Sequence, residues 1–239
     1  YAGDLGGTWF EKERFKKNWN EKQLEDMSTW NHNLQRLELY GGEPLYNKKV
    51  LQHLQSMDPD TTKNITLYFN TNANHIPSQE WKDAMSKFKN VEFMLSLDGV
   101  EDQFEYIRHP GKWRNVLMMR AWLKLNSKWL NISHGIISTV SIMNVYYLPE
   151  MLDLFEDSWA EYVFLNIVEL PTHFCIKNLP DPVKIKVANK LLNSKHKHKL
   201  IEIVNFMNAE PCNELIWTRY LTWTQRIDDY RQQSFQTTF

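Results

Sequence analysis

The stretch Leu37–Leu45 has the sequence LELYGGEPL, in which a short apolar strand runs into Gly-Gly-Glu-Pro. Two glycines at the tip of a strand adopt dihedral angles that other residues avoid, and they let a ligand approach the main chain. The carbonyls of Gly41 and Gly42, with the Glu43 carboxylate, are able to accept hydrogen bonds from an ammonium group. Pro44 then fixes the direction in which the chain leaves. We expect a binding loop for a small cationic group here; the simplest alternative is a plain strand-to-helix turn.

Four more strands are expected further along the chain, and the five strands end at intervals of roughly 30 to 40 residues, as in repeated βα units. The expected strands are Leu37–Tyr40, Ile65–Phe69, Val91–Leu97, Ile132–Ile142 and Tyr162–Val168. Amphipathic stretches between them predict helices after Asn47 and Pro77, over Trp113–Leu125, and around Leu148–Phe155. Parallel strands with right-handed crossovers form either an open doubly wound sheet or a barrel, and the order of elements does not choose between the two.

The two ends of the chain differ from this alternating middle. A helix is expected over Phe10–Trp30 after the glycine-rich entry Gly3–Gly7. Beyond Pro171 three helices are expected with no strand between them, over Val183–Asn193, Lys199–Met207 and Asn213–Tyr230. An apolar stripe in the last helix predicts a surface that docks on the strand-containing part. We therefore divide the chain into an α/β domain, residues 1–170, and a C-terminal helical extension, residues 171–239.

Composition excludes several classes of protein. The 239 residues include 28 basic and 29 acidic ones, so the net charge of −1 indicates neither a nucleic acid nor a membrane surface as partner. No apolar run has the length of a membrane span, and no secretory signal is visible. Cys175 and Cys212 are the only cysteines, and their spacing forms neither a disulfide framework nor a four-ligand metal site. A reduced, cytoplasmic setting is the expectation, with both thiols structurally idle.

Compact polar residues lie at the end of every expected strand. They are Gly41 to Pro44 after the first, Asn70, Thr71 and Asn72 after the second, Ser96 and Asp98 and then Gly99 at the end of the third, Thr139, Ser141 and Asn144 around the fourth, and Asn166 and Glu169 at the end of the fifth. The carboxyl ends of parallel strands meet at one edge, where sites of α/β proteins lie, so these groups predict a small-molecule pocket. Arg108 lies beside His109 and Pro110, and its planar guanidinium group suits a bidentate contact with a ligand carboxylate. The alternative is an ordinary surface arginine in a turn.

Taken in order, the motifs of this chain resemble those of the radical S-adenosylmethionine enzyme superfamily, in its SPASM or twitch-like group. They are LELYGGEPL, LYFNTNA (from Leu67), MLSLDG (from Met94), IRHP (from Ile107) and STVSIMNV (from Ser138). The resemblance covers residues 34 to 170 and implies a partial TIM-type (βα) barrel of parallel strands, here without its first strand, followed by a twitch-like helical remnant.

The resemblance also implies roles for the residues at the strand ends. Gly41, Gly42, Glu43 and Pro44 would hold the methionine amine of S-adenosylmethionine. Ser96, with Asp98 beside it, and Arg108, twelve positions after Ser96, would contact its carboxylate or ribose. Asn70 and Thr71 would line the rim. No residue is given a general acid or base role, and no metal ligand is assigned within the chain.

One departure from the family pattern is large. The superfamily's C-x3-C-x2-C loop, which holds a 4Fe-4S cluster, is absent; it is expected upstream of Tyr1, which makes the chain a fragment of a longer enzyme. In that enzyme the cluster would reductively cleave S-adenosylmethionine and start radical modification of a substrate, such as a peptide or protein, with flavodoxin or ferredoxin as electron donor.

Two alternatives remain open from the sequence. The chain could be a non-catalytic barrel that binds a nucleoside or a partner without a cluster, or a cluster-free α/β transferase. The lysine-rich stretch Lys184–Lys199, which contains His196 and His198, is expected to be a solvated basic segment rather than a metal site, because side chains at i and i+2 of a helix point apart. Partner binding through this stretch is the less favoured interpretation.

Overall fold

The computed structural model describes residues 33–239, and within them the five predicted strands form one parallel sheet in the order β1-β2-β3-β4-β5. The strands are β1 (Arg36–Leu39), β2 (Thr66–Thr71), β3 (Asn90–Ser96), β4 (Ile132–Val140) and β5 (Val163–Ile167). Chain order and spatial order coincide, without the reversal of a doubly wound sheet. The α/β fold is therefore the partial TIM-type barrel that the sequence predicted. The helix expected over Phe10–Trp30 and the segment Gly3–Gly7 lie outside the described residues.

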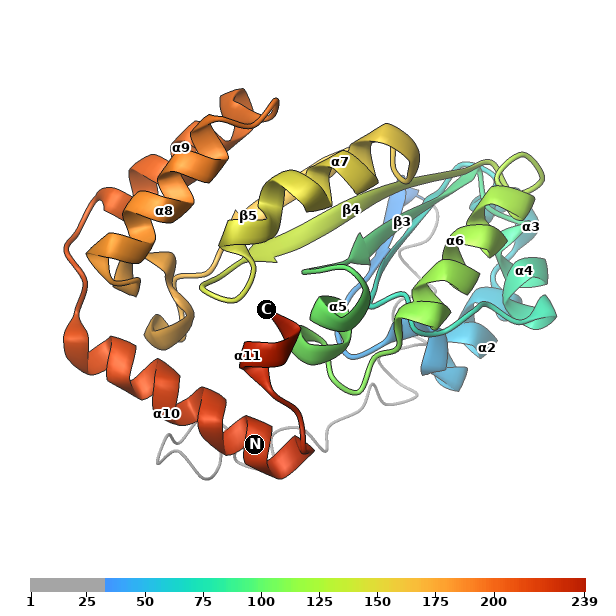
Figure 1. The fold of residues 1–239 in the computed structure, drawn as a ribbon. Coiled ribbons are helices and arrows are strands. Elements are labelled where there is room, and N and C mark those ends of the chain that lie inside the picture. Colours follow the sequence, from blue (N-terminus) through green and yellow to red (C-terminus); the bar gives the residue numbers. More distant parts are fainter. Residues whose placement is uncertain (1–32) are drawn as a thin grey trace.

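Helices cover one face of this sheet (Figure 1). Those that precede or follow the strands are α2 (Lys48–Ser56), α3 (Pro59–Thr62), α4 (Gln79–Met85), α5 (Glu101–Ile107), α6 (Trp113–Asn126) and α7 (Leu148–Ser158). Asn47 caps α2 as expected, because its Oδ1 accepts hydrogen bonds from two backbone N–H groups of the first turn. Short α5 was not predicted; seven residues with one acidic face carry too little periodicity to separate a helix from a loop.

The core lies between the sheet and these helices. Phe69 of β2 and Phe93 of β3 stack with ring centroids 5.0 Å apart and have no exposed surface. Trp81 of α4 and Trp122 of α6 meet these two rings edge-on. Because strand side chains alternate between faces, the residues between these core positions point to the opposite face of the sheet. That face carries polar groups, such as the ion pair between Arg36 Nη1 and Glu92 Oε2 at 2.7 Å.

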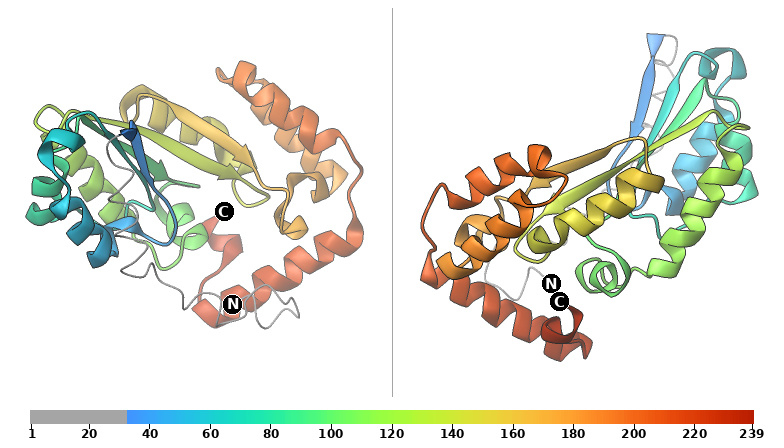
Figure 2. Two further views of the ribbon diagram at one scale, coloured as in Figure 1. Left: turned by 180° about the vertical axis from the view of Figure 1, so that it is seen from behind. Right: turned by 45° about the horizontal axis from the view of Figure 1, so that its top comes forward.

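The remaining chain is helical, as predicted. It comprises the 3-10 turns η6 (Thr172–Phe174) and η7 (Ile176–Asn178), then α8 (Asp181–Leu192), α9 (Lys197–Asn208), α10 (Glu214–Arg231) and the unpredicted α11 (Phe235–Thr238). Figures 1 and 2 show α10 and α11 passing across the end of the sheet where the strands terminate, with α11 beside α5. Within the described part of the chain, every helix is too short or too polar to cross a membrane.

The interpretation of Lys184–Lys199 as a solvated basic stretch holds only in part: Lys186, Lys197 and His198 are exposed, but other side chains are buried or paired. Lys190, Lys195 and Lys199 form ion pairs with Glu150, Asp153 and Glu156 of α7, at 2.6, 3.1 and 2.6 Å. His196 is buried, and its Nε2 lies 2.7 Å from Asp153 Oδ1. Lys184 is also buried, and its Nζ donates to the Glu210 carbonyl at 2.6 Å. The sequence did not predict these contacts, because the acidic partners of Lys190, Lys195 and Lys199 come from a helix about forty residues earlier.

Candidate functional site

The Gly-Gly-Glu loop lies at the carboxyl end of β1. Gly41 and Gly42 have φ angles of +86° and +55°, in the left-handed region that other residues rarely adopt. A Cβ atom added at either glycine would meet no atom of residues 33–239 within 4 Å, the adjacent residues aside. The conformation therefore favours glycine, and the described residues leave the space in front of the backbone open. This combination leaves main-chain groups accessible to a ligand.

The Glu43 carboxylate is held against the end of the neighbouring strand. Thr71 Oγ1 donates to Glu43 Oε1 at 2.7 Å, and the Asn72 backbone N–H donates to Glu43 Oε2 at 2.9 Å. Each carboxylate oxygen has two lone-pair positions, so each retains one for a further donor. Pro44 is buried at the start of η4 (Pro44–Tyr46), which packs against β2. The carboxylate is thus pre-positioned between the ends of β1 and β2.

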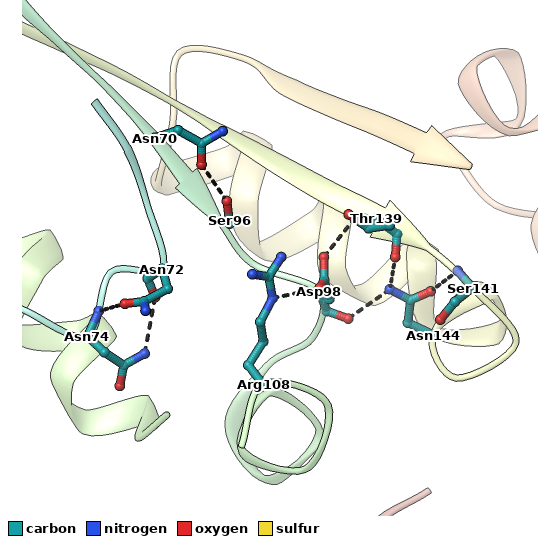
Figure 3. A network of polar contacts seen from close by, with 9 residues as sticks. All are labelled: Asn70, Asn72, Asn74, Ser96, Asp98, Arg108, Thr139, Ser141 and Asn144. Atoms are coloured by element: carbon teal, nitrogen blue, oxygen red, sulfur yellow. Dashed lines mark hydrogen bonds and ion pairs between the residues drawn. The ribbon is translucent and has the colours of Figure 1, made fainter. Parts of the chain in front are cut away.

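The next pair joins β2 to β3. Ser96 Oγ donates to Asn70 Oδ1 at 2.8 Å, as Figure 3 shows. Asn70 lies opposite Met94 in the parallel register, so Ser96 comes two residues later and shares a face of the sheet with it. Both side chains lie near the carboxyl edge of the sheet, which is where the sequence places them.

Asp98 connects β3 to α5 and β4. Arg108 Nε donates to its Oδ2 at 2.6 Å, and the Thr139 backbone N–H donates to its Oδ1 at 2.7 Å. Asn144 Nδ2 donates to the backbone carbonyls of Asp98 and Thr139 at 2.9 and 3.0 Å. In Figure 3 the Arg108 guanidinium extends from α5 toward the strand ends. The hydrogen bond from Nε to Asp98 orients the Arg108 guanidinium group, and its two terminal Nη atoms carry further N–H donors.

Polar contacts therefore run along the edge from β1 to β4. They include every predicted site residue that carries a polar side chain, in three separate pairs: Glu43 with Thr71, Asn70 with Ser96, and Asp98 with Arg108. The Asp98–Arg108 pair itself was missed, because Arg108 was assigned a ligand carboxylate and not one from the protein. The structural role of Asn144 was also missed: its Oδ1 accepts from the Ser141 N–H at 2.8 Å, which turns the chain at the end of β4. The motif STVSIMN contained this signal, since asparagine side chains often close such turns.

The polar residues after the fifth strand do not join this edge network. Asn166 is exposed, and Glu169 lines a separate pocket of about 450 Å³ in the extension, together with both cysteines. Cys175 is buried, and Cys212 Sγ lies 3.2 Å from the Asn178 carbonyl.

Among residues 33–239, no group of three or more side chains of the metal-ligating types lies together. The described residues therefore fit an organic cation at the edge and do not fit an iron–sulfur cluster, which needs more thiolates than this chain contains.

Comparison with known proteins supports the fold. No protein-family model and no curated protein sequence matches the chain. Among solved structures, Streptococcus suis SuiB bound to S-adenosylmethionine aligns with a TM-score of 0.52 and 12% identity, over 78% of this chain and 42% of that one. The protein anSMEcpe with bound S-adenosylmethionine aligns with a TM-score of 0.54 and 16% identity, over 82% of this chain and 56% of that one.

A further structure of anSMEcpe, holding both S-adenosylmethionine and the Cp18Cys peptide, aligns with a TM-score of 0.51 and 15% identity, over 81% of this chain and 55% of that one. The chain thus spans about half the length of the solved structures that it matches. At these identities the comparison establishes a shared fold, the α/β partial barrel, and the site must be argued from its own residues.

Proposed function

We propose that this chain is part of a radical S-adenosylmethionine enzyme, and that the carboxyl edge of its sheet binds S-adenosylmethionine. The observation that carries the proposal is the loop Gly41–Glu43, which combines an open backbone with a carboxylate already fixed in place. The motif order in the sequence supports it. So does the likeness in fold to SuiB and anSMEcpe, whose structures hold S-adenosylmethionine.

The proposed roles follow the chemistry of each group. The Glu43 carboxylate and the carbonyls of Gly41 and Gly42 accept hydrogen bonds from the methionine ammonium group. Arg108, oriented by Asp98, directs its remaining donors at the methionine carboxylate or the ribose. Ser96 contributes a hydroxyl next to them, while Asn70 and Thr71 hold the rim in position.

A 4Fe-4S cluster would have to obtain its thiolates from outside this chain, because Cys175 and Cys212 lie in a different pocket. We further propose a peptide or protein as the substrate, supported by the Cp18Cys peptide present in the anSMEcpe structure. We also propose that the C-terminal extension is a twitch-like remnant. The electron donor would be a protein such as flavodoxin or ferredoxin, and the setting would be cytoplasmic.

Calorimetric titration of the full chain tests the binding site. S-adenosylmethionine should bind, and Glu43→Gln should weaken it roughly 10- to 100-fold, because a hydrogen bond to a charged group contributes about 1.5–3 kcal/mol. Glu169→Gln is the matched control, since this carboxylate also follows a strand but is exposed and outside the edge network; it should leave the affinity unchanged.

A second ligand separates this proposal from a barrel that binds only a nucleoside. 5′-Methylthioadenosine lacks the amino and carboxyl groups of S-adenosylmethionine and should bind at least tenfold more weakly. Equal affinities for the two ligands would favour the nucleoside-binding alternative. An unchanged affinity in Glu43→Gln would contradict the role of this carboxylate.

A further inference from the structure

A second hollow adjoins the edge network on the side of the extension. Its volume is about 210 Å³. Asp98 and Thr139 contribute to it from the ends of β3 and β4, while Phe174 and Trp223 contribute from η6 and α10. Because Asp98 also pairs with Arg108, this pocket and the proposed S-adenosylmethionine site share a wall.

Apolar side chains form most of the pocket's remaining surface. Met143 and Val168 line it from the barrel, and Tyr106 and Ile107 from α5. Purely apolar cavities of about 150 Å³ accept benzene. The volume here therefore suits a phenyl group or a branched aliphatic group, and the polar groups at the strand ends suit the more polar part of the same ligand.

Contacts across the pocket hold its two walls together. The Tyr106 hydroxyl donates to Asp228 Oδ1 of α10 at 2.7 Å, and Arg231 Nη1 donates to the Tyr106 carbonyl at 3.1 Å. On the far side, the rings of Phe174 and Trp223 pack edge-on with centroids 4.7 Å apart. The extension is thus fixed against α5, which ends next to Arg108. A pocket with fixed walls binds a matching group without the cost of ordering those walls.

We propose that this pocket is a specificity pocket, which binds one apolar side chain of phenyl or leucyl size from the peptide substrate. The inference rests on the proposed function for the identity of the larger ligand. The pocket's position assigns the extension a role in substrate selection, because Trp223 and Phe174 come from residues after Pro171. A peptide seated in this way would have its neighbouring residues beside Asp98 and Arg108.

The test uses the full chain labelled with ¹³C at its methionine methyl groups, with Met143 as the reporter inside the pocket. The probes are N-acetyl-phenylalaninamide, N-acetyl-leucinamide and N-acetyl-serinamide. The first two should shift the Met143 methyl signal with saturation in the millimolar range, and the serine compound should not. Val168→Phe should abolish the shift by filling the pocket; Leu170→Phe, at a side chain that is 71% exposed two residues later, should leave it intact. If circular dichroism shows that Val168→Phe is unfolded, Val168→Met replaces it.

The outcomes separate this inference from the proposed function. The specificity pocket is refuted if no probe shifts the Met143 signal, or if the serine compound shifts it as much as the other two. It is also refuted if the signal still shifts in Val168→Phe. Calorimetry with S-adenosylmethionine is run on the same samples. Binding of S-adenosylmethionine without a response at Met143 refutes the specificity pocket alone. A selective response at Met143 without S-adenosylmethionine binding supports the apolar pocket and refutes the proposed function.

Discussion

Substitutions of Gly42 test two properties of the loop separately. The stability of the variants reports on the backbone conformation, and their affinity for S-adenosylmethionine reports on the open space in front of it. At a φ of +55° an alanine adopts the left-handed region, which costs about 1–2 kcal/mol for a residue with a Cβ atom. No further steric cost is expected from residues 33–239, because none of their atoms lies within 4 Å of the new Cβ, apart from the adjacent residues. Gly42→Ala should therefore lower the free energy of unfolding by about 1–2 kcal/mol.

Asparagine is the matched control, because it adopts the left-handed region several times more readily than most residues. Gly42→Asn should cost less than about half of the alanine penalty. Both side chains, however, project into the space where we place the methionine group. Both variants should therefore bind S-adenosylmethionine at least tenfold more weakly.

Urea unfolding followed by tryptophan fluorescence measures stability, and calorimetric titration measures affinity. If only Gly42→Ala, the less stable variant, loses affinity and Gly42→Asn binds S-adenosylmethionine like the wild-type chain, the ligand does not occupy this space. A destabilisation far above about 3 kcal/mol in Gly42→Ala would refute the open geometry, because strain at one backbone position does not reach that size.

Three further predictions address the extension, the core and the response to pH. Tyr106→Phe removes the hydrogen bond to Asp228 and should lower the urea-derived unfolding free energy by about 1.5–3 kcal/mol; an unchanged value would show that this bond does not hold α10 in place. Phe93→Ala should cost about 3–5 kcal/mol in the same assay, since the ring is fully buried, and a loss below 1 kcal/mol would contradict the described packing. Burial lowers the pKa of His173, so the unfolded chain binds more protons and stability should fall as the pH drops below about 6.5. His173→Gln should reduce this slope, measured from pH 7.5 to 5, and an unaltered slope would exclude His173 as a source.

The sequence predicted the strands well because β2 to β5 combine β-branched or aromatic residues with compact polar residues at the strand end, while β1 is marked by the two glycines that follow it. It left open the choice between a barrel and a doubly wound sheet. The order of the strands in the sheet distinguishes the two folds. This order depends on how the crossover connections pack and not on any local sequence pattern. The consecutive order β1 to β5 identifies the partial barrel.

Long-range polar partners were the least predictable feature of the site. Glu43 and Arg108 were identified as residues that present charged groups, but their protein partners Thr71 and Asp98 were not. An isolated arginine in a sequence gives no indication of whether its carboxylate belongs to a ligand or to the protein. The same limit explains His196, whose surroundings come from acidic side chains on α7.

The central claim is that S-adenosylmethionine binds in front of the Gly41–Glu43 backbone. Selective ¹⁵N-glycine labelling of the full chain tests it directly, since the sequence has only 8 glycines. On titration with S-adenosylmethionine, the amide signals of Gly41 and Gly42 should shift. That of Gly135, which lies within β4 where an added Cβ would collide with the Tyr162 ring, should not. Unmoved Gly41 and Gly42 signals at millimolar ligand concentrations would contradict this account.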